Sequence, residues 1–97
     1  MNMNQILKQA QAMQKDMMKA QEEVGRMTFT ASKDLVTVEV NGNRQVTKVT
    51  LAKDIDADDI EMLEDMIMIA TNDALSQAEA EMEKRLGKYS KGMPGLF

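Results

Sequence analysis

Residues 36–42 read Val-Thr-Val-Glu-Val-Asn-Gly, and this stretch decides the middle of the fold. Its three valines occupy every second position and alternate with polar residues, which predicts a β-strand with one apolar face. Asn41 and Gly42 follow as the dipeptide most typical of a two-residue β-hairpin, because both central residues of a type I′ turn need a positive φ. A turn at these two residues would place Glu39 opposite Arg44 as a cross-strand ion pair.

Strand patterns also lie on both sides of this hairpin. Before it, apolar residues alternate with threonine over residues 27–31, and a turn is expected at residues 32–34. After it, a third strand is expected over residues 45–51, with Val49 and Leu51 on one face. Together, the three segments predict an antiparallel three-stranded meander.

Two helices are predicted at the ends of the meander. Residues 4–24 carry apolar side chains at alternating spacings of three and four, which is a heptad seam over about three heptads. Gly25 fits the left-handed position that often follows a helix. Residues 58–86 carry a second apolar stripe, with acidic residues at its start and basic residues at its end, as the helix dipole favours. Gly87 is expected to end this second helix.

The fold class that follows is α+β, with the order α-β-β-β-α in a single domain over residues 1–89. Residues 90–97 contain three glycine or proline residues and are expected to form a flexible tail. A helix over residues 58–86 is about 43 Å long, whereas strands of this length span roughly 17–23 Å. The second helix is therefore expected to overhang its sheet by about 20 Å.

A projecting helix with an apolar stripe needs a second chain to cover that stripe. A homodimer is the simplest arrangement that supplies one, with the projecting parts of both helices at the interface. The residues expected in this interface are Ile6, Ala10, Met13, Met17, Ala20, Val24, Ala74, Ala78 and Met82.

Charge is unevenly distributed along the chain. The chain has 12 basic and 16 acidic residues and a net charge of −4, yet residues 54–83 hold eleven acidic residues and no basic one. Three lysines of the first helix share one face within about 40°, opposite the apolar seam. Basic groups on projecting helices suit the phosphate backbone of duplex DNA. The candidate DNA-binding residues are Lys8, Lys15, Lys19, Lys84, Arg85, Lys88 and Lys91.

Composition argues against an enzyme. Histidine and cysteine are absent, which excludes disulfides, thiol chemistry, zinc sites with the usual ligands and catalytic triads with a histidine base. Acidic pairs such as Glu61 and Asp65 lie on a helix face crowded with other acids, without the desolvated setting that catalytic carboxylates need. We therefore expect no catalytic residue, no cofactor and no small-molecule substrate.

The acidic segment of residues 54–58 begins like a calcium loop, with aspartate at every second position. The sixth position holds Asp59 where glycine is needed, and the twelfth holds Asp65 where glutamate is needed. No metal is therefore expected. Capping of the following helix by Asp56 or Asp58 is the favoured role of this segment.

No segment for export or membrane insertion is visible. The N-terminus is polar and lacks a charged region followed by an apolar stretch. The longest apolar run, residues 66–70, is far too short to span a membrane. We expect a cytoplasmic protein without membrane contact.

Several segments, in this order and at this spacing, carry a resemblance to a known family. They are residues 9–14 (QAQAMQ), 36–42 (VTVEVNG), 61–65 (EMLED), 72–74 (NDA) and 92–97 (GMPGLF). Over nearly its whole length the chain resembles the YbaB/EbfC family of small bacterial nucleoid-associated proteins. The resemblance implies an intertwined homodimer of α-β-β-β-α chains with protruding helical arms. It also implies non-enzymatic binding of duplex DNA with low sequence preference, in nucleoid organisation or gene regulation.

The residues alone leave a second function open, a protein-binding adaptor or holdase-like chaperone module. Amphipathic helical arms rich in methionine suit an adaptable apolar surface. The methionines concerned are Met13, Met17, Met18, Met66, Met68 and Met82, and their other interpretation is the core of a dimer. A DNA complex at low salt distinguishes the two functions, because an adaptor forms none.

Overall fold

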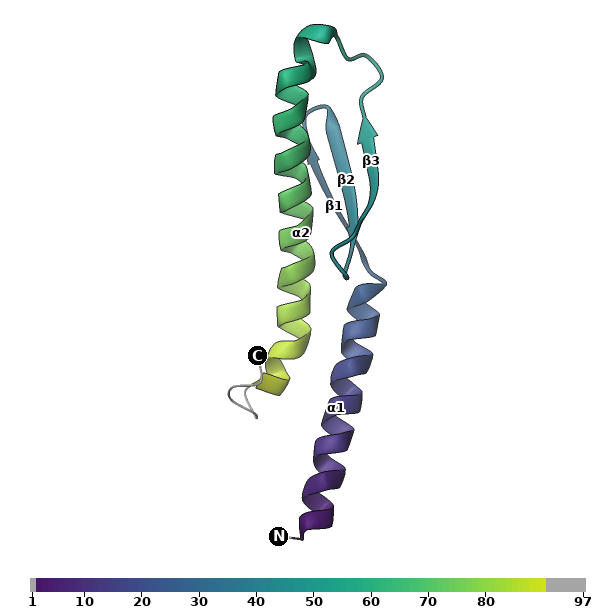
Figure 1. Cartoon of the computed structure of the whole chain (residues 1–97), viewed down its shortest axis with the longest axis vertical. Coiled ribbons are helices and arrows are strands. Elements are labelled where there is room, and N and C mark those ends of the chain that lie inside the picture. Colours follow the sequence, from purple (N-terminus) through teal and green to yellow (C-terminus); the bar gives the residue numbers. More distant parts are fainter. Residues whose placement is uncertain (1, 91–97) are drawn as a thin grey trace.

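The computed structural model of this protein describes residues 2–90, and its elements follow the predicted order (Figure 1). The elements are α1 (Met3–Gly25), β1 (Thr28–Lys33), β2 (Val36–Asn41), β3 (Val46–Leu51), a 3-10 turn η1 (Ala57–Asp59) and α2 (Ile60–Ser90). The α+β class and the sequence of helix, three antiparallel strands and helix are confirmed. Beyond Ser90, the predicted tail lies outside the described residues.

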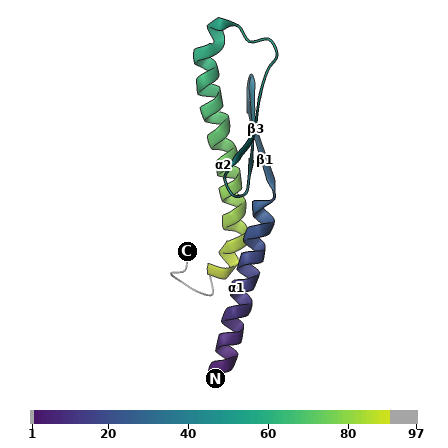
Figure 2. The ribbon, with the colours of Figure 1, turned by 45° about the vertical axis from the view of Figure 1, so that its right-hand side comes forward.

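The molecule is strongly elongated, with principal extents of 70 × 21 × 12 Å. Its radius of gyration is 19.3 Å, whereas a compact domain of about 100 residues has about 13 Å. The sheet lies beside the first half of α2, and α1 leaves the same end of the sheet as the second half of α2 (Figures 1 and 2). Both helices therefore project in one direction, and the N-terminal part of α1 reaches beyond the end of α2 (Figure 1). The predicted overhang is confirmed.

The core lies between α2 and one face of the sheet. β2 is the central strand and is antiparallel to both neighbours. Its three valines are at most 1% exposed, as their alternation predicts. The α2 side chains buried in the same cluster are Leu63, Met66, Ala70, Ala74 and Ala78. Three of these are alanines, whose single methyl group lets the helix lie close to the sheet.

The hairpin between β2 and β3 differs from the prediction. Asn41 N donates to Gln45 O and Arg44 N donates to Asn41 O, both at 3.0 Å, so the loop has three residues rather than two. The residue with a positive φ is Arg44, at 62°, as in a type I turn followed by a left-handed residue. Glu39 therefore lies opposite Lys48 instead of Arg44, with a register shift directly after Glu39.

The side chain of Asn41 explains this loop. Its Oδ1 accepts from the backbone N–H of Asn43 at 2.9 Å and of Gln45 at 3.1 Å, and its Nδ2 donates to Gln45 Oε1 at 2.9 Å. An asparagine that bonds the backbone two residues ahead stabilises a turn that begins at the asparagine itself. The network helps to offset the left-handed conformation of Arg44, which costs a residue with a Cβ about 1–2 kcal/mol.

Gly25 and Gly42 allow the tip of this hairpin to lie on the last turn of α1. A Cβ at Gly42 would be 1.8 Å from Val24 O, and a Cβ at Gly25 would be 2.8 Å from Asn43 Oδ1. The predicted left-handed conformation of Gly25 is wrong, because Gly25 is still helical and the cap is Arg26, in the right-handed region with φ −87°. Close approach to backbone atoms, rather than turn geometry, requires glycine at position 42, whereas Gly25 faces only the end of the Asn43 side chain.

The turn between β1 and β2 lies slightly later than expected. β1 continues to Lys33, which pairs with Val36, so the loop consists of Asp34 and Leu35. Asp34 adopts φ 48°, a conformation that aspartate tolerates better than most residues. Two-residue loops are the commonest hairpin connection, and the predicted turn at residues 32–34 is corrected accordingly.

The start of the second helix agrees with the prediction, and its end does not. Asp56 is the N-cap of η1, and Asp59 Oδ2 accepts from the Asp56 N–H at 3.3 Å. The expectation that Gly87 ends the helix is wrong, because α2 runs to Ser90. Leu86 is buried where α2 lies beside α1. This packing outweighs the cost of about 1 kcal/mol for a glycine inside a helix.

Candidate nucleic-acid interface

Three of the predicted DNA-binding residues come together where α1 and α2 run side by side. Lys19 from α1 and Arg85 and Lys88 from α2 line one shallow hollow of about 320 Å³. The hollow is completed by Asp16, Ala20, Glu23 and Tyr89. Basic side chains from the two ends of the chain thus meet at one place, because both helices leave the sheet in the same direction (Figure 2).

Arg85 is already paired within the chain. Its Nε lies 3.0 Å from Glu81 Oε1 on α2, and its Nη1 lies 3.6 Å from Glu23 Oε2 on α1. Half-exposed pairs of this kind contribute little to stability, but this one links the two helices and neutralises part of the guanidinium charge. Arg85 therefore serves the junction between α1 and α2. Lys88 Nζ lies 5.1 Å from the centre of the Tyr89 ring, within the range of a weak cation–π contact.

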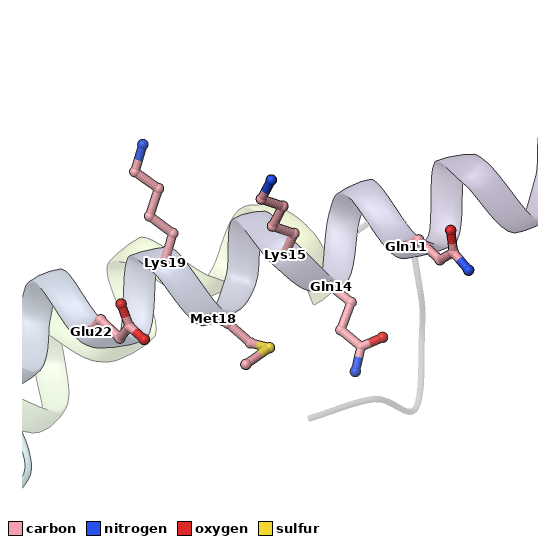
Figure 3. A pocket seen from close by; sticks show the side chains of 6 residues that line it. All are labelled: Gln11, Gln14, Lys15, Met18, Lys19 and Glu22. Atoms are coloured by element: carbon pink, nitrogen blue, oxygen red, sulfur yellow. The ribbon is translucent and has the colours of Figure 1, made fainter.

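Lysines of α1 project on one side of the helix. Figure 3 shows Lys15 and Lys19 extending together, while Gln14 and Met18 extend to the other side. Lys8, two turns nearer the N-terminus, is exposed as well. Within residues 2–90, no ion pair or hydrogen bond engages the ammonium groups of these three lysines. Their charge is available to an anionic ligand.

The most acidic segment of the chain lies at one end of the long axis. The acidic linker and the start of α2 form the end of the molecule farthest from the N-terminus (Figure 1). Lys84 is exposed on the other half of α2 and, among the described residues, makes no ion pair. On the arms the two signs are mixed, because α1 holds three acidic residues beside its three lysines. Lys91 lies outside the described residues.

The predicted dimer residues fall into two groups. Val24, Ala74 and Ala78 are at most 1% exposed in the single chain. The chain's own elements already bury them, so they belong to the core of the protomer and present no surface to a partner. The others remain exposed or half-buried, namely Ile6, Ala10, Met13, Met17, Ala20 and Met82.

A larger uncovered apolar surface lies on β3. Val49 and Leu51 pair with Val38 and Val36 and therefore share their face of the sheet. Yet Val46, Val49 and Leu51 are 42–48% exposed, because α2 packs along β1 and β2 and leaves β3 uncovered. Large apolar side chains are also exposed along α2, namely Ile60, Met62, Met68 and Ile69. The sequence places Val49 and Leu51 on one face, but periodicity carries no information on which strands the helix covers.

The described part of the chain holds neither a membrane-spanning helix nor a cluster of metal ligands. None of its helices is long and apolar enough to cross a membrane. Within residues 2–90, acidic side chains nowhere gather in threes around a position that a metal ion would occupy. The aspartates before α2 act at the start of that helix instead, where Asp59 bonds the backbone of Asp56.

Comparison with solved structures shows the same fold in a protein of Helicobacter pylori. The crystal structure of an uncharacterized protein from Helicobacter pylori matches with a TM-score of 0.78. The match covers 92% of this chain and 97% of that chain at 20% sequence identity. Sequence identity at this level supports only the shared architecture.

Relatives at higher identity carry a common description. A nucleoid-associated protein of Lactococcus lactis is 47% identical over 97% of this chain and 98% of its own length. A nucleoid-associated protein of Enterococcus faecalis is 44% identical, over 98% of this chain and 94% of its own length. The sequence model of the YbaB/EbfC DNA-binding family, which is described by DNA binding and not by a catalytic activity, matches residues 1–93. This chain therefore belongs to the YbaB/EbfC DNA-binding family.

Proposed function

We propose that this protein is a non-enzymatic, nucleoid-associated protein that binds duplex DNA as a homodimer. The observation that carries the proposal is the row of lysines on the projecting part of α1, whose ammonium groups pair with no group within residues 2–90, in a chain of a DNA-binding family. The candidate contacts to backbone phosphates are Lys8, Lys15 and Lys19, with Lys84, Lys88 and Lys91 from the other end of the chain, and a bound duplex engages about four to six of them per dimer. Each neutralised phosphate releases counterions, which is the main source of affinity in such contacts.

Low sequence preference follows from this kind of contact. Phosphate groups are the same at every base pair, so lysines that bind them position the protein without reading sequence. Gln11, one helical turn before Lys15 on α1, adds a polar contact to the DNA backbone. Binding of this kind suits nucleoid organisation or broad gene regulation.

A second copy of the chain is the partner that the uncovered apolar surfaces favour. The apolar face of β3 continues the buried face of β2 within one sheet. α2 covers this face of the sheet over β1 and β2 and leaves β3 uncovered. Eleven large hydrophobic side chains of the described residues are exposed in the single chain, among them Val46, Val49 and Leu51 of β3. Ile6 and the half-buried Met13, Met17 and Met82 extend this surface along the arms.

Net charge sets the conditions for binding. Two chains of −4 each give a dimer of −8, which DNA repels at long range. Affinity then depends on individual lysine side chains placed at the phosphates, since the three lysines of α1 are matched by three acidic residues of the same helix, and it falls steeply with salt. The acidic end of each chain lies away from the arms (Figure 1), which reduces its repulsion of DNA bound there.

Replacing Lys15 and Lys19 with glutamine in both chains tests the proposal. The double change removes up to about four phosphate contacts per dimer, each worth about −0.9 in the slope of log affinity against log salt. Affinity is expected to fall equally on unrelated duplexes, and the slope to flatten toward about −1. Fluorescence anisotropy with labelled duplexes at several salt concentrations measures both quantities. Sedimentation should still show a dimer, because these side chains lie opposite the apolar seam.

A matched control is the double change of Lys33 and Lys53 to glutamine. It removes the same charge at the acidic end of the molecule, away from the arms, and should leave the salt slope unchanged. Equal effects of the two double variants would contradict a binding site on the arms. Absence of any DNA complex, with suppression of a client protein's aggregation, would support an adaptor instead.

A further inference from the structure

Arg44 differs from the other two arginines of the chain. Arg26 Nη2 lies 3.7 Å from Glu22 Oε2, and Arg85 is paired with two carboxylates. Among residues 2–90, by contrast, no carboxylate or other polar group pairs with the exposed side chain of Arg44. Its guanidinium group is therefore unused by the fold.

The backbone at Arg44 disfavours this residue type. Its φ is 62°, a left-handed conformation that glycine adopts freely and that a Cβ makes costly. Only two non-glycine residues in the described chain have a positive φ, and the other is an aspartate, a type that tolerates the region. Strained residues that the fold does not need are candidates for a functional role.

Arg44 is also held at a fixed place beside the DNA-binding arm. Gly42 of the same loop lies against the Val24 carbonyl, and Asn43 lies against Gly25, both in the last turn of α1. The side chain of Asn41 bonds the backbone of the loop on both sides of Arg44. The backbone that carries the guanidinium is thereby fixed beside α1, so that only the side chain has to be ordered on binding.

We propose that Arg44 binds a backbone phosphate of the duplex at the root of the arm. The inference rests on the proposed DNA-binding function and adds a contact from the hairpin that links β2 and β3. A guanidinium presents parallel N–H donors that match two phosphate oxygens, which a lysine ammonium does not. The arm lysines hold the duplex along α1, and Arg44 fixes the position at which the duplex meets the sheet.

Replacing Arg44 with glycine separates the steric cost of this residue to stability from its contribution to DNA binding. The melting temperature is expected to rise by a few degrees, because glycine reaches this φ without a steric cost. DNA affinity is expected to fall about tenfold at low salt, and the slope of log affinity against log salt to flatten by about 2 for the two chains of a dimer. Arg44→Lys should retain most of the slope but bind more weakly than the unchanged protein.

Lys53→Gln is the matched control for net charge, since it removes one charge per chain at the acidic end of the molecule. If Arg44→Gly binds DNA as tightly as Lys53→Gln, the inference is wrong while the proposed function stands. An Arg44→Gly protein that no longer sediments as a dimer would also overturn it, since the residue would then act through assembly. If the unchanged protein binds no duplex, the proposed function fails first and the inference fails with it.

Discussion

Gly42→Ala is expected to detach α1 from the sheet or to unfold the chain. The added Cβ would lie 1.8 Å from Val24 O and 2.3 Å from Val24 C, which are backbone atoms that no rotamer change can move away. The hairpin tip must then leave the last turn of α1, and the contact that fixes the arm is lost. We expect the free energy of unfolding to fall by about 4 kcal/mol or more, which is a large part of the roughly 5–15 kcal/mol that typically stabilises a domain.

Thermal unfolding followed by circular dichroism measures this effect. Gly87→Ala is the matched control, because a Cβ at Gly87 meets no described atom within 4 Å and the residue lies inside α2. That change should be neutral or stabilise the protein by about 0.5–1 kcal/mol. A Gly42→Ala protein that melts at the temperature of the unchanged protein would contradict the contact between the hairpin and α1.

Val49→Lys is expected to abolish the dimer. Val49 is 45% exposed in the single chain, so a lysine there costs the protomer little. In a dimer that covers β3, the same lysine would bury an unpaired charge, which costs several kcal/mol. DNA affinity should fall strongly with it, because only the dimer offers two arms to one duplex.

Sedimentation velocity at micromolar concentration measures the oligomeric state. Thr50→Lys is the matched control, since Thr50 is the next residue of the same exposed strand and pairs with Thr37 on the other face of the sheet. We expect it to remain a dimer. Dissociation by Thr50→Lys and not by Val49→Lys would place the interface on the opposite face of the sheet.

Local patterns predicted the elements well, and contacts between distant segments decided the details that they missed. The alternation of valines predicted the buried face of β2, which is at most 1% exposed. The dipeptide Asn41-Gly42 predicted a hairpin but the wrong loop, because the Asn41 side chain bonds the backbone of a three-residue loop, and the contact of Gly42 with Val24 has no local signal. Gly25 was assigned to a helix cap for the same reason, since the sequence does not reveal that Asn43 approaches it.

In the candidate site, too, local spacing predicted some features, and contacts between distant residues decided the others. Helical spacing predicted that Lys15 and Lys19 share a side of α1, as Figure 3 shows. The ion pair of Arg85 with Glu23 joins residues far apart in sequence and has no local signal. Periodicity also identifies apolar positions without telling what covers them, so Ala74 was assigned to the dimer interface although the sheet buries it.

The most direct test of the account is a titration of labelled duplex DNA with the unchanged protein, between about 50 and 200 mM salt. Four to six phosphate contacts per dimer predict a slope of log affinity against log salt of about −4 to −5. Affinity would then fall a few hundred-fold to about a thousand-fold over this range, and equally on unrelated duplexes. Absence of any complex at about 50 mM salt would contradict DNA binding by this chain, and a slope near zero would contradict binding through phosphates.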